Sequence, residues 1–157
     1  MPERRAQILT RLATVLGDID GFPNFLRNRG DADPDERPCM VLLDGTETVH
    51  QNFEGRAGRV YARTASSVMM LEPGIFALLH AREAAKASEY EALLAECRKE
   101  VVYKILHDEE LADITGANGD IAWRGFDTDM QSGRTMQGEM QFFFRFYYVV
   151  DPSQDLA

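Results

Sequence analysis

The chain has 157 residues, the size of one domain, and a chain of this length buries enough surface to fold without a metal or a disulfide. No window approaches the ~18 consecutive apolar residues of a membrane span, and the N-terminal segment lacks the apolar core of a signal peptide, so we expect a soluble protein folded in a cytoplasm. The formal charge of −9, from 17 Lys and Arg against 26 Asp and Glu, repels nucleic acid and argues against a module that grips DNA or RNA.

The first predicted element is an amphipathic helix over residues 3–16, where apolar residues recur at helical spacing and a glycine follows. Residues 22–28 predict a short strand, which Pro23 either starts or confines to an edge of the sheet. The polar segment 30–38 predicts a loop. The uninterrupted apolar run 39–43 that follows predicts a buried central strand.

The middle of the chain is less regular. Residues 46–58 contain two glycines and no periodicity, which predicts a long mobile hairpin loop. Alternation over 59–65 and then 68–71 predicts further strand. Pro73 interrupts this pattern, and residues 75–79 either resume the strand after a bulge or lead out of the sheet.

A long second helix is predicted from Ser88 to about His107. It opens on a capping box, in which a serine is followed three residues later by Glu91. Residues 109–114 are compatible with one further helical turn before a glycine-rich break. Residues 120–126 then predict the penultimate strand.

The last apolar stretch, residues 136–150, alternates with a period of two and therefore predicts a strand. A polar turn precedes it, so the two final strands form a hairpin. One face of the final strand is apolar throughout, and the other is mixed and includes Phe143, Arg145 and Tyr147. This pattern is typical of a sheet that packs on a core by one side and faces water or a partner by the other.

The element order predicts one α+β domain over residues 1–157: a mainly antiparallel sheet of four to six strands with two helices packed on one face. Two helices can cover only one face of such a sheet. The opposite face, with Phe143, Tyr147 and Val149, is left for solvent or another subunit.

Residue types that carry catalysis or bind metals are sparse. The three histidines, His50, His80 and His107, are spread over a predicted loop, a strand end and a helix end. Cys39 and Cys97 lie in apolar patterns without metal-ligand spacing, so we expect two buried free thiols.

Acidic residues give two weak signals. The run 31–35 has the opening spacing of a calcium loop, but Glu36 stands where a glycine is expected and Leu42 where the bidentate acid is expected. Asp127 and Asp129 beside a glutamate suggest a carboxylate pair across the C-terminal hairpin, although a turn-forming role is favoured. We therefore expect no catalytic residue, no cofactor and no metal.

Three stretches carry a resemblance to a known family: residues 38–45 (PCMVLLDG), 69–79 (MMLEPGIFALL) and 138–152 (GEMQFFFRFYYVVDP). Together with the element order, they resemble the small tail-terminator proteins (tail-completion, minor tail protein U type) of long-tailed phages and gene-transfer particles. The likeness spans most of the chain and lies in pattern and order. Head-to-tail connector and adaptor proteins have a similar size and composition, and they remain an alternative.

The resemblance implies a structural virion protein that is not an enzyme. It implies a homo-oligomeric ring, usually a hexamer, that caps the tail tube, stops its polymerisation and joins it to the head connector. The partners would be further copies of the chain, the tail tube protein and the head connector protein, with no membrane and no specific nucleic acid. The location would be the virion tail, after assembly in the host cytoplasm, and an acidic lumen would let DNA pass.

Candidate interface residues lie on the mixed face of the last strand and in or beside the predicted loop: Phe143, Arg145, Tyr147, Phe53, Arg56 and Arg59. Two other classes of protein stay open. One is a non-viral α+β domain that binds or converts a small ligand between sheet and helices, which requires a charged or histidine side chain on the inward face of a strand. The other is a regulatory or toxin–antitoxin-type adaptor that dimerises through the aromatic face.

Overall fold

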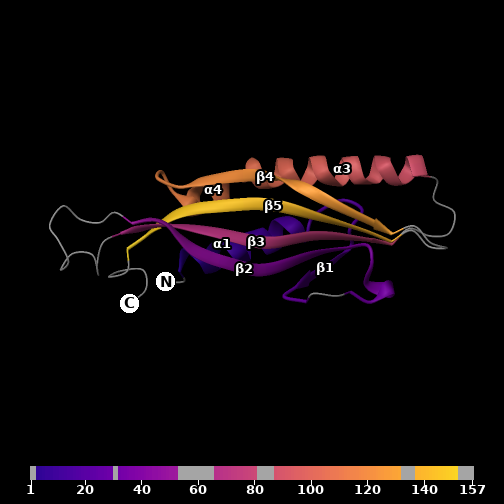
Figure 1. Cartoon of the computed structure of the whole chain (residues 1–157), viewed down its shortest axis with the longest axis horizontal. Coiled ribbons are helices and arrows are strands. Elements are labelled where there is room, and N and C mark those ends of the chain that lie inside the picture. The colour runs from indigo at the N-terminus through magenta and orange to yellow at the C-terminus, as the bar shows by residue number, and fades with distance from the viewer. Residues whose placement is uncertain (1–2, 30–31, 53–65, 81–86, 132–136, 152–157) are drawn as a thin grey trace.

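The computed structural model describes residues 3–29, 32–52, 66–80, 87–131 and 137–151 (Figure 1). The elements in chain order are α1 (Arg4–Leu16), β1 (Asn24–Arg27), the 3-10 helix η1 (Pro34–Glu36), β2 (Cys39–Asn52), β3 (Ser67–His80), α3 (Ala87–Leu106), α4 (Glu109–Thr115), β4 (Asp120–Gln131) and β5 (Gln137–Val150). The predicted α+β class is confirmed.

Within the described residues, five strands form one sheet in the order β1-β2-β3-β5-β4. The pairs β2–β3, β3–β5 and β4–β5 are antiparallel, and only the short edge strand β1 runs parallel to its neighbour β2. The prediction of a mainly antiparallel sheet is therefore confirmed. The last strand, β5, is an interior strand that pairs with β3 on one side and β4 on the other.

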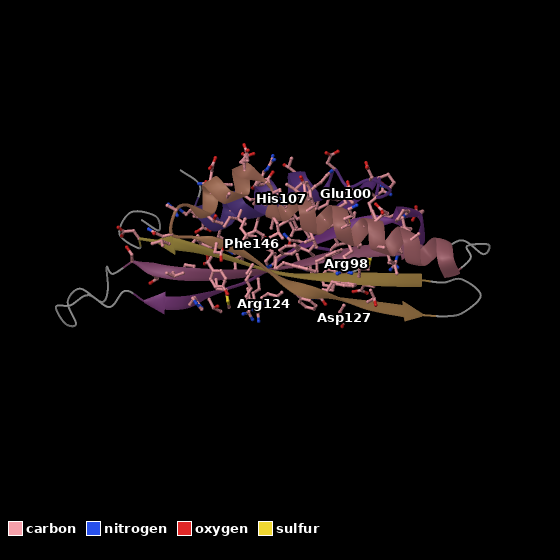
Figure 2. All side chains as sticks on the ribbon, turned by 90° about the horizontal axis from the view of Figure 1, so that it is seen from above. Arg98, Glu100, His107, Arg124, Asp127 and Phe146 are labelled. Carbon is pink, nitrogen blue, oxygen red and sulfur yellow. The ribbon has the colours of Figure 1, made fainter. Side chains whose placement is uncertain are left out.

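Three α-helices in the described part of the chain lie on one face of the sheet, where two were expected (Figure 2). The additional helix is α4, which the sequence suggested only as a further turn. It starts as a separate helix because the side chain of Asp108 caps it, accepting a hydrogen bond from the backbone N–H of Leu111 at 2.9 Å.

The main core lies between these helices and the sheet. The inward residues of α1 and α3 are those that the helical spacing predicts: Ile8, Leu9, Leu12, Val15 and Leu16 from α1, and Cys97, Val101 and Ile105 from α3. The inward face of β5 supplies a row of large side chains: Met140, Phe142, Phe144, Phe146, Tyr148 and Val150. Each Leu or Phe buried in this way contributes roughly 1.5–3 kcal/mol.

Strand β2 is longer than predicted. Residues 46–52 pair with β3, whereas we expected a loop over residues 46–58; residues 53–65, including the strand expected over 59–65, lie outside the described residues. The strand was hidden because the register shifts by one residue between Leu43 and Thr46, which reverses the alternation of side chains.

This bulge explains both a glycine and a proline. Gly45 has φ +74°, and a Cβ there would lie 2.0 Å from the carbonyl oxygen of Glu72 on β3. Pro73 stands opposite the bulge, where its missing N–H breaks no ladder bond. Strand β3 therefore continues past the proline, and residues 75–79 resume the strand as one of the two alternatives predicted.

Strand β4 also extends beyond its predicted end, because the long β5 offers pairing partners as far as Gln131. Asp127 lies opposite Gln141, and Asp129 lies opposite Glu139. The expectation that these two aspartates form a turn is wrong.

Candidate docking surface on the open face of the sheet

The face of the sheet opposite the helices, here called the open face, carries part of the site predicted from the sequence. On β5, Phe144 is 2% exposed on the helix side, whereas its neighbour Phe143 is 40% exposed on the open face. Arg145, Tyr147 and Val149 follow at every second position and are partly exposed. The one-sided burial that the alternation predicted is therefore confirmed.

A groove of about 520 Å³ crosses the open face. Its lining comes from all the strands except β1: Leu43, Gly45, Glu72, Pro73, Gly74, Phe76, Arg124, Gln141, Phe143, Phe144 and Arg145. A side chain in place of Gly74 would press within 3.0 Å of Leu43 and Phe76, so glycine keeps these two apolar residues in position. The groove thus combines aromatic walls with charged groups at its border.

The charges on the open face are only partly paired. Arg145 Nε lies 3.5 Å from Glu72 Oε1, which joins β5 to β3, but Glu72 is exposed and Arg145 partly exposed, and such a pair contributes only about 0–1 kcal/mol. Figure 2 shows Arg124 on the side of the sheet away from the helices, and it makes no ion pair with a described residue. A partner with a carboxylate beside an apolar side chain would satisfy both features.

Tyr147, the second predicted aromatic, contacts a histidine. Its ring centroid lies 5.0 Å from that of His50 on β2, at an interplanar angle of 63°, so the two rings meet edge to face. Strand β3 separates β2 from β5, so the two side chains reach toward each other across it. His50 was expected in a loop and instead belongs to the open face.

Near β1, the side chains on the open face are buried and not accessible. There Cys39, Val41 and Leu78 are buried and pack with Leu26, Ala32, Leu43 and Phe76, which makes a second, smaller apolar cluster. A depression of about 110 Å³ beside it, lined by Val41, Leu43, Phe76, Leu78 and Glu139, shares Leu43 and Phe76 with the larger groove. The surface that remains accessible therefore lies toward β3, β5 and β4.

Both cysteines are buried free thiols, as predicted. Burial raises the pKa of Cys39, and it raises the pKa of Cys97 to about 12. Neither thiol is therefore suited to nucleophilic chemistry at neutral pH.

The structure brings together half of the predicted interface. Phe143, Arg145 and Tyr147 stand side by side on β5, while Phe53, Arg56 and Arg59 lie outside the described residues.

Leu43, Phe76 and Arg124 are among the groove residues that sequence reasoning missed. Alternation along β3 could have placed Phe76 on the face opposite the buried Ile75. Arg124 was hidden because the register with β5 shifts between Trp123 and Gly125.

The inward side of the sheet does contain one acidic group. Tyr148 is buried on β5, and its hydroxyl donates a hydrogen bond to the carboxylate of Glu47 on β2. Burial, followed by this bond, raises the pKa of the Tyr148 hydroxyl. A ligand-binding domain would need an inward charged group such as Glu47, but the Glu47 carboxylate already accepts the hydrogen bond from Tyr148.

The remaining candidates do not converge. His107, at the end of α3, places Nδ1 3.0 Å from the carbonyl oxygen of Tyr103, and the side chain of His80 is not described. In the stretches that the structure describes, no group of three or more His, Cys, Asp and Glu side chains is placed to hold a metal. None of the described helices is long and apolar enough to cross a membrane.

No family model and no curated protein matches the chain. Among solved structures, a chain from the virion of a native gene transfer agent (GTA) particle is similar, with a TM-score of 0.45 and 13% identity over 94% of this chain and 96% of that chain.

Proposed function

We propose that this chain is a structural virion protein of the tail-terminator type. It assembles into a ring, caps the tail tube, stops polymerisation of the tube protein and presents a surface to the head connector. The proposal rests on the sequence resemblance described above. The structural observation that carries it is the open face, where an aromatic groove remains uncovered by the chain's own helices.

An uncovered groove of this kind favours a protein that works by docking. Phe143 stands beside the groove with 40% of its surface exposed, although burying it would contribute roughly 1.5–3 kcal/mol. Contiguous exposed apolar surface, rimmed by polar groups, is typical of protein interaction sites. Arg124 and Arg145 supply such a rim, and arginine is enriched in interfaces.

A function by assembly also suits the chemistry of the site. The groups that border the groove are two arginines, a glutamate and a glutamine around aromatic and aliphatic side chains. These groups can position a partner through charge and hydrogen bonds. Terminating a polymer requires no bond to be made or broken, so we propose that the chain is not an enzyme.

The proposal is tested by adding the purified chain to purified tail-tube protein of the same particle. The wild-type chain should bind tube ends and limit tube length in electron micrographs, and Phe143→Glu should remove this effect while circular dichroism stays unchanged. Thr10→Glu, on an exposed position of α1, is the matched control and should behave as wild type.

Two outcomes would contradict the proposal. A folded wild-type chain that leaves tube length unchanged and binds only the head connector would indicate a head-to-tail adaptor. A stable dimer that binds neither protein would indicate a regulatory adaptor.

A further inference from the structure

Helix α3 exposes a second stripe beside the one that it buries. Cys97, Val101 and Ile105 face the core, but Tyr103 is 61% exposed and Trp123, on the neighbouring β4, is 37% exposed. Together they belong to a groove of about 380 Å³ between α3 and β4, lined by Ala95, Arg98, Lys99, Val102, Tyr103, Leu106, His107 and Trp123. We call it the α3–β4 groove.

This groove is basic in an otherwise acidic chain. The guanidinium carbon of Arg98 lies 4.6 Å from the ring centroid of Phe126 and 5.7 Å from that of Trp123, so the aromatic rings hold it in place. Among the described residues, neither Arg98 nor Lys99 forms an ion pair, whereas Lys104 of the same helix reaches Glu100 at 3.1 Å. Two cations beside exposed aromatic side chains favour an acidic occupant.

The adjoining edge strand is not suited to pairing with a strand of another chain. The register of β4 shifts between Trp123 and Gly125, and the indole Nε1 of Trp123 donates a hydrogen bond to the carbonyl oxygen of Gly125 at 3.0 Å. Bulges of this kind interrupt the row of free backbone groups that a new strand would need. Docking at this edge must therefore use side chains.

The opposite edge of the sheet carries an acidic turn. Strand β1 and the neighbouring η1 lie across the molecule from α3 and β4 (Figure 1). Glu36 joins the turn to neighbouring residues, because Arg29 binds its carboxylate at 2.8 Å and Asn24 of β1 donates to its carbonyl at 2.9 Å. Asp33 and Asp35 remain exposed.

We propose that the α3–β4 groove of one copy receives the η1 turn of the next copy, an inference that rests on the ring proposed above. The carboxylates of the turn would face the two cations of the groove, and the aromatic side chains would pack against the turn. The two surfaces are different and lie at opposite edges, so the contact is heterologous and repeats from copy to copy, as a ring requires. It leaves the open face to the tube or the connector.

Charge exchange across the proposed contact tests it. We expect Lys99→Glu alone and Asp35→Lys alone each to weaken self-association of the full chain by roughly tenfold or more, since each places like charges in contact. The chain carrying both changes should recover to within about threefold of wild type, because the pair is restored with its signs exchanged. Sedimentation velocity and native mass spectrometry measure the ring, and circular dichroism checks the fold.

Thr10→Glu is the control, because it adds a negative charge at an exposed position of α1 that belongs to neither surface of the contact. It should leave the mass of the ring unchanged. Suppose that the wild-type chain forms a ring. If neither single change weakens self-association, or if the double change does not restore it, the proposed contact is wrong but the ring is not. A wild-type chain that stays monomeric at all concentrations would overturn the contact and the proposed function together.

Discussion

The two faces of β5 differ in what they do although they are built from similar residues. Phe143 and Phe144 are adjacent and identical in chemistry, yet one is 40% exposed and the other 2%. Their positions differ only by one step in the pleat, which turns successive side chains to opposite faces. The comparison shows that adjacent residues of a single strand can be buried in the core or left accessible on the open face, so stability and the proposed docking can be changed separately.

The largest expected effect is a charge placed on the covered face. Phe144→Glu should unfold the chain, because it removes a buried aromatic side chain, a loss of roughly 3–5 kcal/mol, and leaves an unpaired carboxylate in the core. Phe143→Glu, the matched control, should remain folded. Circular dichroism and urea unfolding measure both, and two equally unfolded variants would contradict the one-sided sheet.

A smaller effect is expected at Asp108, which links α1 to the start of α4. Arg11 of α1 donates two hydrogen bonds to the carboxylate of Asp108, at 2.6 and 2.9 Å, and the same carboxylate caps α4. Asp108→Ala should lower the free energy of unfolding by about 2–3 kcal/mol, since it removes a cap and a charge-assisted pair. If the free energy of unfolding changes by less than about 0.5 kcal/mol, as for ordinary surface substitutions, α4 is held by its apolar contacts alone.

The same contact should make stability depend on pH. The hydrogen bonds from Arg11, followed by the one from the Leu111 N–H, hold the pKa of Asp108 below its usual range. Because the folded pKa is lowered, this stabilisation is present above the ordinary aspartate value of about 3.9 and is lost as pH falls through the folded pKa. The gap in melting temperature between wild type and Asp108→Asn should therefore narrow below about pH 4. A constant gap would contradict this assignment.

The smallest effect is expected for a charge pair on the open face. Arg145→Ala removes the 3.5 Å ion pair with Glu72, but water reaches both groups, so the free energy of unfolding should fall by less than about 1 kcal/mol. Binding to a partner should weaken more than stability does. Urea unfolding midpoints measure the loss of stability, and a tube-capping assay measures the loss of binding. A large loss of stability would contradict the assignment of Arg145 to docking and not to folding.

Much of the fold could be predicted because its signals are local. The period of two over β5 and the helical spacing over α1 each lie within one continuous segment, so the outward positions of Phe143 and Tyr147 followed directly. The bulge at Gly45 was not predicted. It reverses the alternation in β2, and the need for glycine there comes from the close approach of Glu72 on the next strand.

The missed parts of the site depend on pairing between distant segments. Leu78 of β3 is buried on the open face because Cys39 and Val41 of β2 pack with it there. No periodicity within either strand contains that information. The α3–β4 groove was missed for the same reason, since Arg98 and Trp123 lie on separate elements.

The interior position of β5 affects how the protein is made. Ribosomes add β5 after the other four strands, yet β3 and β4 pair with β5 and not with each other. A nascent chain stopped before residue 137 therefore exposes a bare strand edge on both sides of the gap and lacks most of its aromatic interior. Truncated translation products should therefore aggregate or be degraded.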